Sequence, residues 1–207
     1  MGINEYDKVP PSVESFIVFD RYTEIPAIDY DNYGEGLCRR RIRLENISDS
    51  VSIGELEDDF HHFRVEIHHK GNKVNHIQGT TFRAPWSTCS EVNKPLQEIV
   101  GLQLSKDSTS IGAYGSPTEN CTHLFDLTGL LVSHILGEER SKQYDLAITD
   151  PVNGFQKLFL WKDGIAVFKW EVQDSVIIAP KTLEGVSLQG KFISWAKDNF
   201  DEAIVEG

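Results

Sequence analysis

The chain has 207 residues and carries 20 Lys and Arg against 32 Asp and Glu, which gives a formal net charge of −12 with the histidines neutral. This balance argues against nucleic acid as a partner, because phosphates are bound by positively charged surfaces. Apolar residues make up 40% of the chain and charged residues 25%, as in a globular protein. No apolar run approaches the roughly 20 residues of a membrane-spanning helix. No signal peptide is recognisable at the start, so we expect a cytoplasmic protein with no membrane partner.

The first half of the chain predicts antiparallel strands behind a short lead-in. Residues 1–13 are expected to be a flexible lead-in, and 14–207 a single domain with one candidate sub-boundary at 138–143. Residues 37–44 alternate between apolar side chains and arginines, as in a half-buried strand. The arginine side of this strand is expected either to be solvated or to pair with the chain's own acidic groups.

Residues 60–82 predict a β-hairpin. Apolar and polar side chains alternate over 60–69 and 73–82, and the sequence Lys70-Gly71-Asn72 between them is typical of a turn. From Trp86 to Gly101 apolar residues recur at helical spacing, and a proline inside this run predicts a kink or break. The hairpin is therefore expected to lead into the first of two main helices.

The second half predicts another helix and then more strands. A mostly buried helix is expected from Asn120, as its N-cap, to Gly137. Residues 192–200 predict an amphipathic closing helix. The intervening strand patterns cover 144–149, 155–161, 165–171 and 176–178. The predicted fold class is therefore α+β: an antiparallel β-sheet packed with two main helices, plus a C-terminal β-meander and the closing helix.

Reactive side chains gather at the ends of three predicted elements, where scaffolded sites usually lie. These stretches are 57–62, 85–89 and 120–123. Three cysteines are too few and too scattered for a disulfide framework, so free thiols are expected. A thiol near a helix N-terminus is stabilised as the thiolate, which makes Cys89 and Cys121 candidate reactive groups. An isolated cysteine is also commonly a core residue.

These residues are compatible with several kinds of chemistry. Acid–base or nucleophilic catalysis requires carboxylate, imidazole or thiol groups in contact. The candidate catalytic residues are Asp59, His61, Cys121 and His123. The same groups are ligands of Zn²⁺ and related metals. The candidate metal ligands are Asp59, Cys89, Cys121 and His123. Arg83 and Trp86 are candidate substrate-binding residues, with Trp86 as a pocket wall.

Two motifs of the chain resemble a known family. Pro85-Trp86-Ser87-Thr88-Cys89 reads as Pro-Trp-x-x-Cys, and Cys121-Thr122-His123-Leu124 forms a second distinctive element. Together with the acidic, histidine-containing stretch 57–67, they resemble a bacterial domain family of unknown function over about Arg41 to Pro180. The resemblance implies a family without implying a mechanism.

The order of the elements is also similar, more distantly, to that of iron–sulfur cluster assembly scaffold proteins. This resemblance implies that Asp59 matches the scaffolds' conserved aspartate and Cys121 their last cysteine. Glu57 and Trp86 stand at the positions of the other two cluster cysteines, and Cys89 lies one helical turn after Trp86. One of three cluster cysteines is therefore in register.

Two classes of function follow from these residues. The first is an enzyme that processes a small molecule, of the lyase, isomerase or hydrolase type, with an Asp/His/Cys constellation. The second is a metal- or sulfur-handling accessory protein, and a non-catalytic ligand-binding module is a further alternative. A site without a cofactor is an equal alternative to bound zinc or iron. The expected partner is a small-molecule substrate, and no motif specifies an oligomeric state.

Overall fold

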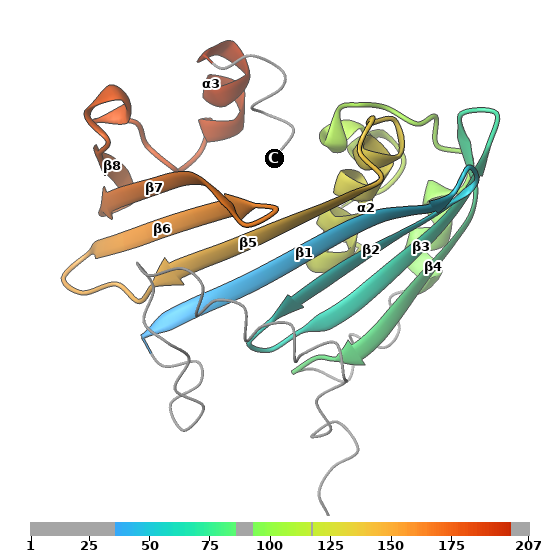
Figure 1. The fold of residues 1–207 in the computed structure, drawn as a ribbon, viewed down its shortest axis with the longest axis horizontal. Helices are drawn as coiled ribbons and strands as arrows, with labels where there is room; N and C mark the ends of the chain where they lie inside the picture. The colour runs from blue at the N-terminus through green and yellow to red at the C-terminus, as the bar shows by residue number, and fades with distance from the viewer. Residues whose placement is uncertain (1–35, 86–92, 117, 200–207) are drawn as a thin grey trace, which may run out of the picture.

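Eight antiparallel strands form one continuous sheet in the order β4-β3-β2-β1-β5-β6-β7-β8 (Figure 1). The structure is a computed structural model that describes residues 36–85, 93–116 and 118–199. The strands are β1 (Leu37–Ser48), β2 (Val51–Asp58), β3 (His62–Lys70), β4 (Lys73–Arg83), β5 (Ser141–Thr149), β6 (Phe155–Lys162), β7 (Ile165–Gln173) and β8 (Val176–Ala179). The α-helices are α1 (Asn93–Leu96), α2 (Thr122–Ile135) and α3 (Phe192–Asn199), and the 3-10 turns are η5 (Gln97–Ile99), η6 (Ser108–Ala113) and η7 (Lys181–Leu183).

The predicted α+β fold with two main helices is wrong, because the sheet dominates the described residues and their helices are few and short. Where the first main helix is expected, the described residues contain only the single turns α1 and η5. Pro95 lies within α1 and has no backbone N–H to donate, which disfavours a longer regular helix. Leu96 and Ile99 still reach the core. The C-terminal strands β5 to β8 do form the predicted meander, and β5 pairs directly with β1, so the meander continues the same sheet.

The β3–β4 hairpin confirms the strands predicted over residues 60–82. Phe63, Val65 and Ile67 alternate along β3 and are fully buried, whereas the residues between them are less so. Gly71 and Asn72 form the turn with φ angles of 57° and 63°. These left-handed conformations are most accessible to glycine and asparagine, so the local sequence specifies this turn.

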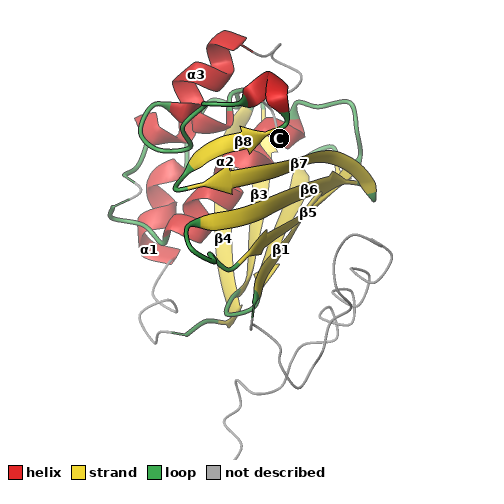
Figure 2. Ribbon diagram, turned by 90° about the vertical axis from the view of Figure 1, so that its left-hand side faces the viewer, coloured by secondary structure: helices red, strands yellow, loops and turns green. Residues whose placement is uncertain are grey.

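Helix α2 covers β1, β2 and β3 on one side of the sheet and completes the main core (Figure 2). Leu124 and Leu127 of α2 are fully buried, and Gly54 of β2 leaves room for the Leu127 side chain. The prediction of a buried helix is confirmed. Its N-cap residue is Cys121 rather than Asn120, whose side-chain amide donates instead to the Ser116 carbonyl at 3.0 Å.

The opposite side of the sheet carries a layer of paired charges. Arg41 on β1 forms an ion pair with Asp145 on β5, and the two side chains are 3% and 0% exposed. On β2, a hydrogen bond from His62, together with one from Arg64, lowers the pKa of Glu55 to about 2. Pairing of the arginine-rich side with the chain's own acidic groups is therefore confirmed, and at Arg41 this side is buried rather than solvated.

Several sequence predictions concern the limits of the domain. Residues 1–13 lie outside the described residues, and the candidate sub-boundary at 138–143 falls where the chain passes from α2 into β5. The division into a lead-in and one domain stays a prediction. Helix α3 takes the place of the predicted closing helix. In the part of the chain that the structure describes, no helix is long and apolar enough to cross a membrane.

Candidate functional site

Three polar side chains meet where the β2–β3 turn faces the start of α2. Asp58 is the last residue of β2, His61 directly precedes β3, and His123 lies in the first turn of α2. Each offers one nitrogen or carboxylate oxygen atom, and these atoms all lie within 4.8 Å of one another. This group, the Asp58–His61–His123 cluster, joins two parts of the sequence that are far apart.

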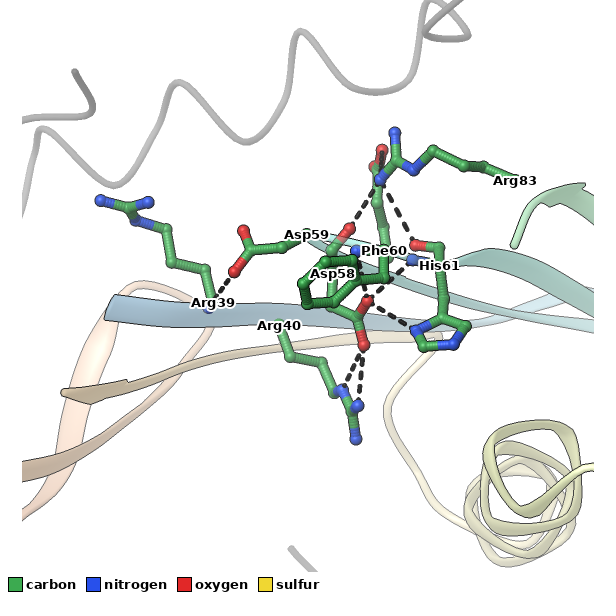
Figure 3. Close-up of polar contacts among 8 residues, drawn as sticks. Arg39, Arg40, Asp58, Asp59, Phe60, His61 and Arg83 are labelled. Carbon is green, nitrogen blue, oxygen red and sulfur yellow. Dashed lines mark hydrogen bonds and ion pairs between the residues drawn. The ribbon is translucent and has the colours of Figure 1, made fainter. Parts of the chain in front are cut away.

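Asp58 is buried, and its carboxylate accepts five hydrogen bonds (Figure 3). Its Oδ2 atom accepts from Nη2 and Nε of Arg40 at 2.7 and 3.2 Å. Its Oδ1 atom accepts from the backbone N–H groups of Phe60 and His61 at 3.0 and 2.8 Å, and lies 2.9 Å from His61 Nδ1. Burial alone would raise the pKa of Asp58, but the hydrogen bonds together lower it. Asp58 is therefore an anion at neutral pH.

The rings of His61 and His123 lie against each other. Their centroids are 4.1 Å apart and their planes make an angle of 33°. Phe63 adjoins both rings, with centroid distances of 5.5 and 6.0 Å. Burial lowers the pKa of His123, and the charges of His61 and Arg40 lower it further. His123 is therefore a neutral imidazole at neutral pH, able to accept a proton.

Arg83 at the end of β4 holds the turn that carries Asp58 and His61. Its Nη2 donates to the backbone carbonyl of Asp58 at 2.6 Å, and lies 3.4 Å from the His61 carbonyl oxygen and from Glu57 Oε1. Figure 3 shows Arg83 and Arg40 on opposite sides of this turn. Arg83 thus contacts backbone at the site, and its predicted contact with substrate stays a prediction.

The structure brings Asp58, rather than the neighbouring Asp59, into contact with His61. The Oδ2 atom of Asp59 accepts a hydrogen bond from the backbone N–H of Arg39 at 3.4 Å. Consecutive residues of a strand point to opposite sides of the sheet. Asp58 lies on the side of Leu56, which is buried in the core beneath α2, so the alternation along β2 is the signal that distinguishes the two aspartates.

The predicted cysteine sites are only partly within the described residues. Cys121 is the N-cap residue of α2 and is half-buried against the core, two positions before His123. Cys89 and Trp86 lie outside the described residues, so their predicted roles stay predictions. Cys38, on β1, is exposed. Of the predicted site residues, His61 and His123 come together, and Arg40 and Asp58 join them although the sequence pattern did not single them out.

Comparison with known proteins gives a family for part of the chain. No curated protein matches it. The segment that does match a family extends over residues 44–136, from the middle of β1 to the end of α2. It includes Asp58, His61 and His123 but not Arg40. The matching family is described as "Protein of unknown function (DUF2889)", and the match confirms that residues 44–136 carry a domain of unknown function.

Proposed function

We propose that the chain is a small-molecule enzyme in which His61 and His123 exchange protons with a bound substrate. The observation that carries this proposal is the 2.9 Å contact between Asp58 Oδ1 and His61 Nδ1. A carboxylate at Nδ1 fixes the ring orientation and favours the tautomer with its proton on that nitrogen. The Nε2 atom of His61 is then a proton acceptor, as general base catalysis requires.

The two histidines have different surroundings, which suits an acid–base pair. Asp58 contacts His61 at Nδ1 and so fixes the orientation of that ring. For His123, burial is the largest influence on the pKa, and it lowers that pKa. His61 is thus oriented with its Nε2 atom as the proton acceptor, and His123 supplies a second imidazole for the return of a proton. Isomerases, lyases and many hydrolases need such a pair, because a proton leaves one atom of the substrate while another atom gains one.

A divalent metal is the second candidate for this site. It is favoured by the convergence of one carboxylate oxygen and two imidazole nitrogens within 4.8 Å, since two histidines and a carboxylate bind Zn²⁺ or Fe²⁺ in many proteins. The five hydrogen bonds to Asp58 weigh against direct ligation by its carboxylate. In a metal-bound form, His61 and His123 would be the ligands and Asp58 would orient His61.

The metal- or sulfur-handling accessory role belongs to this second candidate. On the resemblance to cluster scaffolds, it needs Cys121 together with further cysteine ligands. The half-buried Cys121 directly precedes α2, so it is suitably placed to be one of them. Cluster assembly therefore depends on thiols, whereas proton transfer at the Asp58–His61–His123 cluster does not, and substitution of Cys121 separates the two.

The experiment follows proton abstraction directly. Purified protein is incubated in D₂O with small ketones, keto acids and thioesters, and exchange of the hydrogens next to the carbonyl group is measured by NMR. A parallel assay follows hydrolysis of p-nitrophenyl acetate. Whichever of these reactions the wild-type protein catalyses, we expect His61→Gln and His123→Gln to lower its rate by at least about 100-fold. His76→Gln, on β4, and Cys121→Ala are expected to leave it unchanged.

Equilibrium dialysis against Zn²⁺ and Fe²⁺ under anaerobic, reducing conditions tests the metal candidate with the same variants. Activity in metal-free protein that is lost in His61→Gln supports proton transfer by the imidazoles. Activity that requires stoichiometric metal, with the metal lost in both histidine variants, would support the second candidate instead. An activity equally strong in His61→Gln and wild type would contradict the proposal.

A further inference from the structure

An apolar surface begins directly beside Arg40, on the same side of the sheet as α2. In the strand register, Arg40 on β1 lies opposite Leu146 on β5. The same row of opposed residues continues across β6 to Phe168 on β7. The next row along the strands starts at Cys38. It continues through Ile148, Leu158 and Trp170. Residues paired across an antiparallel sheet share one face. We call the group Leu146, Ile148, Leu158, Phe168 and Trp170 the apolar strip.

The described residues cover the apolar strip only in part. Leu146 and Leu158 are half-buried, and Ile148 is 36% exposed. Phe168 and Trp170 are also half-buried, and their stacked rings lie 4.1 Å apart. Leu146 and Phe168 pack against the edge of the core, and Ile148, Leu158 and Trp170 continue the apolar surface beyond it. A contiguous, partly exposed apolar surface is a feature of ligand-binding and interaction sites.

Aromatic rings from α3 border the far end of the strip. The ring of Phe192 lies 6.0 Å from that of Trp170, and Trp195 stacks on Phe192 at 5.7 Å. The strip thus runs from the polar Asp58–His61–His123 cluster to an aromatic end formed by β7 and α3. A molecule lying along it would meet polar groups at one end and apolar groups over the rest of its length.

Arg40 stands at the junction between the two parts. Its side chain is 36% exposed, and its hydrogen bonds to Asp58 involve its Nε and Nη2 atoms. A guanidinium has five N–H groups, so further donors remain on Arg40 for a planar anion such as a carboxylate. The charged groups facing Arg40 are Asp58, which already accepts from it, and the exposed Asp126 on α2, which lies within its electrostatic reach.

We infer that the substrate class of this site is a small organic acid with an apolar body. Its carboxylate binds the remaining donors of Arg40, and its apolar body lies on the strip formed by Leu146, Ile148 and Trp170. This inference rests on the proposed function, because it supplies the substrate whose polar end lies beside His61. It differs from that proposal in being a statement about binding, which can be measured without turnover.

The test uses straight-chain carboxylates from butanoate to octanoate as probes, with binding to the full chain measured by calorimetry. We expect the dissociation constant to fall by about two- to fourfold for each added methylene group, since each buries further apolar surface. Octanol and octylamine, which have the same chain, test the head group. Octanoate is expected to bind at least tenfold more tightly than either. Equal or tighter binding of octylamine, or no dependence on chain length, overturns the inference.

Matched variants locate the binding surface. Ile148→Asp places a charge on the strip at an exposed position, and we expect it to weaken octanoate binding at least tenfold. Ile165→Asp, at a 74% exposed position in the first residue of β7, is the control and is expected to bind octanoate as wild type does. Arg40→Gln should weaken octanoate binding and leave octanol binding unchanged. Unchanged octanoate binding in both Ile148→Asp and Arg40→Gln contradicts the inference.

The variant His61→Gln separates this inference from the proposed function. It removes the candidate proton acceptor and leaves Arg40 and the strip in place, so we expect octanoate to bind it as tightly as wild type. If octanoate binds to the strip but no variant alters proton exchange, the inference stands and the proposed function fails. If proton exchange depends on His61 but alkyl carboxylates do not bind, the inference alone fails.

Discussion

At the scale of single residues, the site depends on which of two adjacent aspartates faces the helix. Asp58 and Asp59 have the same chemistry, and local sequence chemistry alone selects neither. The direction of each follows from the strand alternation, which puts Asp58 with Leu56 on the side covered by α2. His61 and His123 were predictable from their places at the ends of elements. Arg40 was not, because its role depends on a partner on β2, and no strand was predicted over residues 51–58.

The charge of Arg40 is predicted to control the protonation of His123. Arg40 contributes to the lowered pKa of His123, after burial and His61. Replacing this cation by a neutral group removes a repulsion with the imidazolium form, so Arg40→Gln should raise the pKa of His123 toward its usual value. NMR titration of the ring protons measures the pKa of His123. Lys142→Gln, far from His123 at the other end of α2, is the control, and a pKa of His123 that is unchanged or lower in Arg40→Gln would contradict this account.

At the scale of elements, the apolar patterns of the sequence predicted α2 and, among the described strands, all but β2, whereas the short turns were missed. The segment 105–118 is rich in Gly, Ser and Thr and is expected to be a loop, yet it contains the 3-10 turn η6. Asp107 caps this turn by accepting from Thr109 N at 2.9 Å. The packing of η6 on α2 relies on Gly129, because a Cβ atom there would lie 2.4 Å from the Ser108 carbonyl oxygen. The loop-like composition of this segment therefore did not indicate that η6 packs on α2.

Gly129→Ala is predicted to destabilise the protein by about 1–3 kcal/mol, because the added methyl group forces η6 away from α2. The intrinsic helix preference of alanine favours the substitution by up to about 1 kcal/mol, so a loss of stability would show that packing dominates. Urea unfolding measures the change. Gly112→Ala, in η6 itself, meets no atom within 4 Å and is the control. A Gly129→Ala variant more stable than wild type would show that η6 can move away from α2 without a loss of stability.

At the scale of the whole molecule, the sheet is continuous because β1 pairs on one edge with β2 and on the other with β5. The first pairing is between neighbours in sequence and follows from a tight turn. The second joins Arg41 to Asp145, across α1, α2 and the β2–β4 strands. Such non-local pairing cannot be derived from local patterns. For that reason the C-terminal strands were predictable as strands, but the pairing of β5 with β1 was not.

The buried Arg41–Asp145 pair is predicted to be essential to the joining of the two halves of the sheet. Arg41→Met leaves the Asp145 carboxylate buried without that cation, which should cost about 3–5 kcal/mol of unfolding free energy. The double variant Arg41→Met/Asp145→Leu should recover most of this loss. Urea unfolding of the two single variants and the double variant gives the coupling energy.

The control for this cycle is Lys162→Met, which removes the exposed pair with Glu139 and should change stability by less than about 1 kcal/mol. Single variants of Arg41 and Asp145 that are no more destabilised than Lys162→Met would show that the central pair contributes little to the joining of β1 and β5.

The central position of β1 also sets how the chain can be divided. The family match begins at Leu44, part-way along β1, and ends at the close of α2. An isolated fragment with these limits would lack Arg40 and would leave the outer edge of β1 without β5, as an open edge on which other chains could add strands. The smallest unit that retains the Asp58–His61–His123 cluster with its guanidinium therefore begins before Leu37 and extends at least through β5.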